Sequence, residues 1–379
     1  MSSRSRETFN LDFIRQNPDL VRGALSNRQL DPILVDTVLR LDETQQEEEL
    51  ALVAEEIPNI PAPDVPIGRD WTESVVIKTV GERPKFGFTP LDHVDLGEEL
   101  DIIDMRRVEQ ISGPHFSFFK NEAATLEMSL MFYAFSKLTR RGFRGMLPPV
   151  MIKEETEWGC GYDGRKDIRG GNRYSLSDDG LVLITSSEHS VIPIHGGEVL
   201  DPTKLPLQYV NYSQCFRREP NIYGRDLRGL LRVHNFNKVE MNVFTAPNFE
   251  TSDNMCLGLL AIEEEIMQEL GLPYQVVKSC TGDLPRPNRR MYDINTWFPG
   301  QDYYRETHSC SNCGDYQARR LNIRVEVDGK LEFVHTLNAT AVADRVLLAI
   351  LENNQQADHS ITIPQVLWPY TGFQEIRKP

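Results

Sequence analysis

The chain has 379 residues, 40% of them hydrophobic and 26% charged, and it carries a formal net charge of −15 at pH 7. This balance is typical of a globular protein, and the length suits one large domain with a small appendage. Because so acidic a chain repels phosphate backbones, the composition excludes broad, nonspecific nucleic-acid binding, and any polyanion must meet a local cluster of positive charge.

An N-terminal helical segment is the first predicted unit. Asn17 and Pro18 mark the start of one helix, and apolar residues from Ile33 to Leu41 repeat with helical spacing. PNIPAPDVPIG, residues 58–68, then has four prolines in eleven positions, which is typical of a stiff linker. We therefore expect a helical domain over 1–57 and a larger domain over 58–379. The chain shows neither a secretion signal nor a membrane-spanning run, which predicts a cytoplasmic protein.

The larger domain alternates helical and β-rich patterns. Helices are predicted near residues 122–140, 254–270 and 343–353. Short strands are predicted at LVLITS, QYVNYSQCF, VEMNVFTA, YQVVKSC, LNIRVEV and LEFVHTL. This order predicts an α+β fold, an antiparallel sheet flanked by helices. The sequence has no GxGxxG after a strand and no Walker loop, so neither of the usual nucleotide-binding folds is indicated.

The densest positive charge lies in residues 215–240, CFRREPNIYGRDLRGLLRVHNFNKVE. Arginine makes bidentate bonds to phosphate oxygens, and the aromatic face of Phe236 offers a surface on which a purine can stack. The five arginines of this stretch are Arg217, Arg218, Arg225, Arg228 and Arg232. Composition alone leaves two readings open, a nucleotide clasp and a surface hairpin with solvated charges.

This stretch resembles motif 2 of the class II aminoacyl-tRNA synthetases, and in detail that of the seryl-tRNA synthetases, through FRRE and GLLRVHNFNKVE. GFRGMLPPV resembles motif 1 and TSSE the serine-binding loop. CTGDL, YRETHSCSNCGDYQARR and HTLNATAVADRVLLAILEN resemble the run through motif 3. The resemblance covers about residues 58–370 and, more weakly, the N-terminal helices. It implies a class II fold, a homodimer, and ATP- and Mg²⁺-dependent activation of L-serine followed by transfer to the 3′ end of tRNA.

The resemblance assigns ATP-binding roles residue by residue. It implies that Arg217 contacts the α-phosphate, where charge develops during adenylate formation, and that Arg345 closes the other side of the base and the γ-phosphate. Glu306 and Ser309 offer oxygen ligands to Mg²⁺. Arg217, Arg345 and Glu306 are therefore the expected catalytic residues. The remaining expected ATP contacts are Glu219 with the adenine amino group, Phe236 stacked on adenine, and Arg232 on the bent phosphates.

Serine must be told from alanine and glycine, which a site does best by hydrogen-bonding the hydroxyl group. The resemblance implies that Glu240 binds the α-amino group and hydroxyl of serine, with Asn338 and Thr340 nearby and with Ser186 and Glu188 facing the ammonium. His308, Cys310 and Cys313 also invite a zinc interpretation, but one CxxC without a second pair is weak evidence for it.

Several positions depart from the family pattern. Pro220-Asn221, Asn235, Asn295 and a shorter motif 3 turn predict altered amino-acid specificity or activity. The larger departure concerns the family's long antiparallel coiled coil, which grips tRNA and is here called the arm. The polar segment Asp42 to Glu49 spans only about 12 Å even as a helix, so the arm is missing. Three functions stay open: a serine-tRNA ligase with weakened tRNA binding, an armless enzyme that passes serine to a carrier protein or small-molecule acceptor, and a non-catalytic paralogue.

Overall fold

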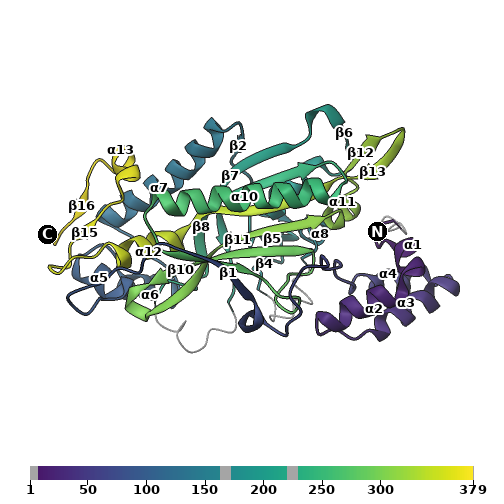
Figure 1. The fold of residues 1–379 in the computed structure, drawn as a ribbon, viewed down its shortest axis with the longest axis horizontal. Coiled ribbons are helices and arrows are strands. Elements are labelled where there is room, and N and C mark those ends of the chain that lie inside the picture. Colours follow the sequence, from purple (N-terminus) through teal and green to yellow (C-terminus); the bar gives the residue numbers. More distant parts are fainter. Residues whose placement is uncertain (1–6, 163–171, 220–228, 379) are drawn as a thin grey trace.

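The computed structural model describes residues 7–162, 172–219 and 229–378. Figure 1 shows a small group of N-terminal helices beside a larger body built on a sheet. These helices enclose a hydrophobic cluster of their own. They are α1 (Leu11–Gln16), α2 (Pro18–Asn27), α3 (Ile33–Glu43) and α4 (Glu47–Ala54). On this packing we propose the two domains that the sequence predicts, 1–57 and 58–379.

Helices α3 and α4 form a short hairpin. They have 11 and 8 residues, so the longer spans about 17 Å. The chain turns between them at residues 44–46, where Gln46 N donates to Leu41 O. The first turn of α4 is acidic, with Glu47, Glu48 and Glu49 all exposed. The hairpin is thus too short to be the arm of the family.

The larger body is centred on an eight-stranded sheet with the order β1-β9-β10-β11-β14-β8-β7-β2. Every neighbouring pair is antiparallel except β2 and β7. The strands are β1 (Val75–Val80), β2 (Arg144–Met146), β7 (Leu207–Phe216), β8 (Asn235–Thr245), β9 (Tyr274–Lys278), β10 (Arg290–Phe298), β11 (Tyr303–Gly314) and β14 (His335–Ala343). The predicted α+β fold with an antiparallel sheet is confirmed.

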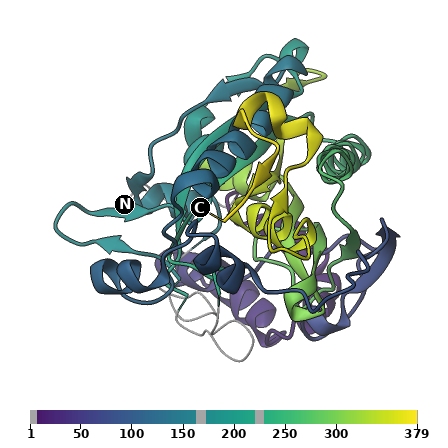
Figure 2. The same cartoon turned by 90° about the vertical axis from the view of Figure 1, so that its left-hand side faces the viewer.

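Three helices cover one face of this sheet: α7 (Asn121–Arg140), α10 (Phe249–Glu269) and α12 (Asp344–Asn353). Figure 2 shows α10 in green, seen along its axis beside the sheet. Because side chains alternate along a strand, Val239 and Met241 of β8 point into the core under these helices. Lys238 and Glu240 therefore point to the opposite face, where the functional residues gather.

Smaller elements complete the body. Its other helices are α5 (His93–Glu99), α6 (Met105–Ser112), α8 (Glu154–Gly159), α9 (Glu188–Val191), α11 (Tyr316–Leu321) and α13 (Trp368–Thr371). Its other strands are β3 (Met151–Lys153), β4 (Ser175–Leu176), β5 (Leu181–Leu183), β6 (Val199–Leu200), β12 (Arg324–Val327), β13 (Lys330–Phe333), β15 (Ile361–Thr362) and β16 (Glu375–Ile376). None of the helices in the described ranges is long and apolar enough to cross a bilayer.

Candidate active site

A cleft opens on the face of the sheet opposite the three helices. It is bounded by the ends of β7 and β8, by β11 and β14, and by the first turn of α12. The seven residues predicted to bind ATP all line it: Arg217, Glu219, Arg232, Phe236, Glu306, Ser309 and Arg345. Segments that are more than 100 residues apart in the chain thus meet at one site.

Arg217 follows directly after the end of β7 and is held from several sides. Its backbone N–H donates to His234 O at 2.9 Å, and its Nε donates to Thr185 O at 3.3 Å. The guanidinium carbon lies 5.0 Å from the centre of the Phe236 ring. A planar cation fixed in this way is preorganised to meet negative charge in the cleft.

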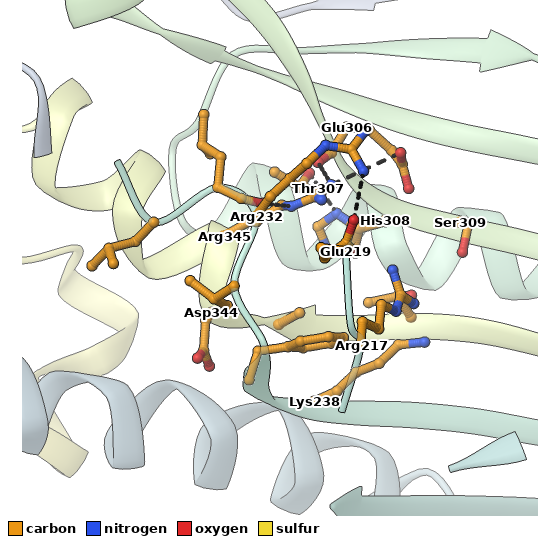
Figure 3. A pocket seen from close by; sticks show the side chains of 16 residues that line it. Arg217, Glu219, Arg232, Lys238, Glu306, Thr307, His308, Ser309, Asp344 and Arg345 are labelled. Atoms are coloured by element: carbon orange, nitrogen blue, oxygen red, sulfur yellow. Dashed lines mark hydrogen bonds and ion pairs between the residues drawn. The ribbon is translucent and has the colours of Figure 1, made fainter. Parts of the chain in front are cut away.

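Arg345 is anchored elsewhere in the cleft. Its Nε donates to Leu231 O at 2.8 Å, and its Nη1 donates to Glu306 O at 2.7 Å. Burial lowers the pKa of Arg345, but arginine remains charged at neutral pH. Figure 3 shows Arg217 and Lys238 lying together, apart from the group that contains Arg345, Arg232 and Glu306. Positive charge therefore reaches the cleft from two separate elements.

Glu306 and Ser309 share the cleft because of a β-bulge. In a regular strand, residues three apart point to opposite faces. The pairing of β10 with β11 shifts register here, since Ile294 pairs with His308 while Asn295 pairs with Glu306. Thr307 is the extra residue, so the bulge brings Glu306 to the face that Ser309 occupies. Asn295, one of the departures from the family pattern, is thereby the cross-strand neighbour of Glu306.

The oxygen atoms of Glu306 and Ser309 are ligands that suit a hard cation. The Glu306 side chain is 57% exposed, and both it and Ser309 line the cleft with oxygen atoms. Mg²⁺ usually takes one or two protein oxygens and completes its shell with phosphate and water, so these two residues fit it. Among the described residues, no three His, Cys, Asp or Glu side chains are grouped so as to hold a metal. Cys310 contacts Cys256, and Cys313 contacts Asn288.

Next to the cleft, Glu240 is at the centre of a buried polar network. Its carboxylate accepts from Ser186 Oγ at 2.7 Å, from Ser187 Oγ at 2.5 Å and from Lys238 Nζ at 2.7 Å. Burial opposes ionisation, but Lys238 and the two hydroxyls hold the pKa of Glu240 below its usual value. Glu240 is therefore a carboxylate already paired with an internal cation. Lys238 and Ser187 were not predicted from the sequence.

Glu188, at the start of α9, belongs to the same network. Burial, reinforced by the charge of Glu240, raises the pKa of Glu188 to about 8, although Gln317 and Asn338 oppose the rise through hydrogen bonds. Gln317 Nε2 donates to Glu188 Oε1. Thr340 lines the cleft, and Lys238 lines it too while bonding Glu240. All five predicted serine-binding residues are thus buried around one small region that adjoins the ATP cleft.

Some predicted features lie elsewhere. Arg225, Arg228 and Pro220-Asn221 fall outside the described residues. Glu352, whose oxygens could also suit a metal, is fully buried in the last turn of α12 and does not line the cleft. It bonds His93 and Gly300 instead.

Residues 174–354 match the family described as the tRNA synthetase class II core domain (G, H, P, S and T). The serine-tRNA ligase of Treponema denticola is 44% identical over 336 residues, which cover 88% of this chain and 79% of the relative. That of Symbiobacterium thermophilum is 42% identical over 427 aligned positions, covering 98% of this chain and 100% of the relative. Since this chain has only 379 residues, at least 48 of those positions have no counterpart in it.

The fold of the chain is also similar to that of a solved structure. The seryl-tRNA synthetase of Pyrococcus horikoshii, crystallised with ATP, superposes with a TM-score of 0.89 at 34% identity. The superposition covers 97% of this chain and 99% of that one. The similarity therefore extends over the whole described fold and includes the N-terminal helices.

Proposed function

Because the chain belongs to the serine-tRNA ligase family of class II aminoacyl-tRNA synthetases, we propose that it joins L-serine to tRNA in two steps within this cleft. One observation carries the proposal: seven candidate ATP contacts line one cleft, and a buried Glu240 network adjoins it. In the first step the serine carboxylate attacks the α-phosphorus of ATP and pyrophosphate leaves. In the second step a ribose hydroxyl of tRNA attacks the carbonyl of seryl-adenylate, and AMP leaves.

Arg217 and Arg345 supply the electrostatic part of the first step. The α-phosphate gains negative charge as the carboxylate approaches, and Arg217 is already fixed beside Phe236 before ATP arrives. Donors that need no reorganisation stabilise such a transition state more than the ground state. Arg345 and Arg232 would hold the outer phosphates, Glu219 the adenine amino group, and Phe236 the purine face. Mg²⁺, held by Glu306 and Ser309, would neutralise phosphate charge.

Serine would lie between the cleft and the buried network. Glu188 and Ser186 would receive its ammonium, and Glu240 with Asn338 and Thr340 would receive its hydroxyl group. Since Lys238 already pairs with Glu240, we assign most of the ammonium recognition to Glu188. A pocket that satisfies the hydroxyl group rejects alanine and glycine because they leave these buried groups unpaired.

We propose a homodimer in the cytoplasm. Large apolar side chains are exposed on α7 and in the motif 1 region that follows it: Met128 at 71%, Phe132 at 61% and Leu147 at 78%. Met128 and Phe132 are four residues apart and share one face of the helix. Exposed apolar surface of this kind marks an interface, and a twofold-symmetric contact between two copies would bury it.

The short α3–α4 hairpin favours a second candidate acceptor. Helices α3 and α4 carry one basic residue, Arg40, against three exposed glutamates at the turn, so the hairpin offers RNA phosphates little positive charge. An armless enzyme that transfers serine to a carrier protein or a small molecule would need no such charge.

Comparing acceptors tests the function directly. The purified protein is incubated with ATP, Mg²⁺ and labelled serine, together with either a serine tRNA or a phosphopantetheinylated carrier protein. We expect labelled tRNA with a raised KM for tRNA. Label on the carrier protein alone would replace tRNA as the acceptor and keep the activation step.

A further inference from the structure

A buried histidine–glutamate pair lies outside the cleft and contacts a backbone segment that lines it. His93 lies at the start of α5 and Glu352 in the last turn of α12; they are 1% and 0% exposed. His93 Nδ1 lies 2.6 Å from Glu352 Oε1, which also accepts from the His93 backbone N–H at 3.1 Å. The other carboxylate oxygen accepts from Gly300 N at 2.8 Å. Neither residue lines the cleft.

The hydrogen bonds fix the state of the His93 ring. Leu230 N lies 3.0 Å from His93 Nε2, and a backbone N–H can only donate. Nε2 is therefore the acceptor, so the proton of the neutral ring is on Nδ1 and is donated to Glu352. The carboxylate thus orients the ring so that its free lone pair meets the Leu230 peptide group. In this arrangement a carboxylate acts on a backbone segment through a histidine.

The segment that receives this bond is part of the ATP cleft. Leu230 and Leu231 both line the cleft, and Arg232 follows them. Leu231 O accepts from Arg345 Nε at 2.8 Å. Arg345 and Glu352 both belong to α12, so this one helix holds two successive residues of the segment. Arg345 bonds Leu231 directly, and Glu352 acts on Leu230 through His93. The segment lies just before β8 and is not itself in a helix or strand.

Gly229 shows how close this contact is. Its φ is +100°, a region that residues with a Cβ rarely adopt. A Cβ at this position would lie 2.7 Å from His93 Nε2 and 3.0 Å from its Cε1. The backbone can approach the imidazole only because this residue has no side chain.

We propose that His93, oriented by Glu352, is a positioning residue for ATP: it fixes the segment 229–232 so that Arg232 and the Arg345 anchor at Leu231 face the nucleotide. This inference rests on the proposed function, because it concerns the same cleft. His93 touches no substrate in this account. Its loss is expected to weaken ATP binding and to spare serine binding, because the serine network is built on residues 186–188, on β14 and on β8 beyond this segment.

The test measures serine-dependent exchange of labelled pyrophosphate into ATP, with KM determined separately for ATP and for serine. His93→Phe keeps an aromatic ring but leaves the Leu230 N–H without an acceptor. A buried N–H that loses its acceptor shifts an equilibrium about tenfold. We expect the ATP KM to rise about tenfold and the serine KM to stay within about twofold. His93→Gln can both accept and donate, so it should recover most of the loss.

A matched control removes a histidine elsewhere. His195→Phe also deletes two side-chain hydrogen bonds, to Glu198 and Tyr209, but these residues do not line the cleft. Its ATP KM should be unchanged. Gly229→Ala disturbs the same contact from the other side and should raise the ATP KM as His93→Phe does, so it serves as the test if His93→Phe does not fold.

The outcomes separate the two proposals. If the unmodified protein exchanges pyrophosphate but His93→Phe leaves the ATP KM unchanged, or raises both KM values equally, the positioning role is overturned. If the unmodified protein shows no serine-dependent exchange, the proposed function itself is contradicted.

Discussion

At the scale of single residues, the active site depends on charges that are paired before any substrate binds. Glu240 is fully buried, and Lys238 with the hydroxyls of Ser186 and Ser187 satisfies its carboxylate. The sequence resemblance identified Glu240 but not Lys238, although KVE places the two on one face of a strand. Lys238 was missed because an alternating lysine is usually a solvated charge. Its burial follows only from the packing of β7 and β14 on either side of β8.

Replacing Lys238 with Met should destabilise the protein. The change leaves the Glu240 carboxylate buried without its cation, and breaking a buried pair in this way costs about 3–5 kcal/mol. Denaturant unfolding should show this loss, and the serine KM should rise as well. Lys204→Met removes an exposed lysine near Asp201, where the cost should stay within about 0.5 kcal/mol. Equal stability of the two variants would contradict the network described here.

The raised pKa of Glu188 predicts how serine binding depends on pH. With a pKa of about 8 this carboxyl is mostly protonated at pH 7, and only its ionised form attracts the ammonium of serine. The ionised fraction grows with pH, so the serine KM should fall about 25-fold between about pH 6.5 and 8.5. Steady-state exchange kinetics across this range would measure it. Glu188→Gln should abolish the dependence, and a KM that is flat in the unmodified protein would contradict the assignment.

At the scale of elements, the sequence predicted the long helices well, because their apolar spacing is set locally. Helices predicted at 122–140 and 343–353 agree with α7 and α12 within one residue. Helix α10 begins five residues earlier than predicted, since the side chain of Asn248 caps it by accepting from Thr251 N. Strand prediction was weaker. LVLITS forms a strand only as far as Leu183, and LNIRVEV begins with the last residue of α11.

Two central strands, β10 and β11, were not predicted, and β11 carries the two candidate metal ligands. Both are buried on both faces over much of their length, so they lack the alternation that marks a strand. The bulge at Thr307 cannot be read from the sequence, because it depends on the register between these two strands. The resemblance found Glu306 and Ser309, but spacing alone would have placed them on opposite faces.

The α3–α4 hairpin predicts weak tRNA binding that an arm should restore. Inserting an antiparallel coiled coil with basic residues at the turn, residues 44–46, adds positive charge that can meet RNA phosphates. We expect the KM for tRNA to fall about tenfold or more, with serine-dependent exchange unchanged. An acidic coiled coil of equal length is the control. No difference between the two grafts would show that the missing arm does not limit tRNA binding.

At the scale of the whole molecule, the N-terminal helices are bound to the body by buried contacts. Arg28, directly after α2, donates to Leu284 O and Pro285 O, and Thr281 Oγ1 donates to Asn27 O. The sequence predicted a linker at 58–68 but could not show these contacts, which join residues more than 250 positions apart. These contacts therefore fix the N-terminal helices, and with them the short α3–α4 hairpin, to the larger body.

The exposed apolar face of α7 predicts the assembly state. Phe132→Asp places a charge at the centre of this face, and a buried unpaired carboxylate would disfavour the dimer. Light scattering coupled to size exclusion should show dimers for the unmodified protein and monomers for the variant. Leu331→Asp alters an exposed apolar residue on β13 and should leave the dimer intact. A variant at Phe132 that remains dimeric would place the interface elsewhere.

The central claim is that this cleft activates serine. The most direct measurement is the exchange of labelled pyrophosphate into ATP with Mg²⁺, using serine, threonine, alanine, glycine and cysteine in turn, because it needs no acceptor. We predict exchange with serine well above the others, and its loss by about a thousandfold or more in a folded Arg217→Ala variant, as expected for removal of a preorganised donor. Exchange with none of these amino acids, or exchange that survives in Arg217→Ala, would contradict the account.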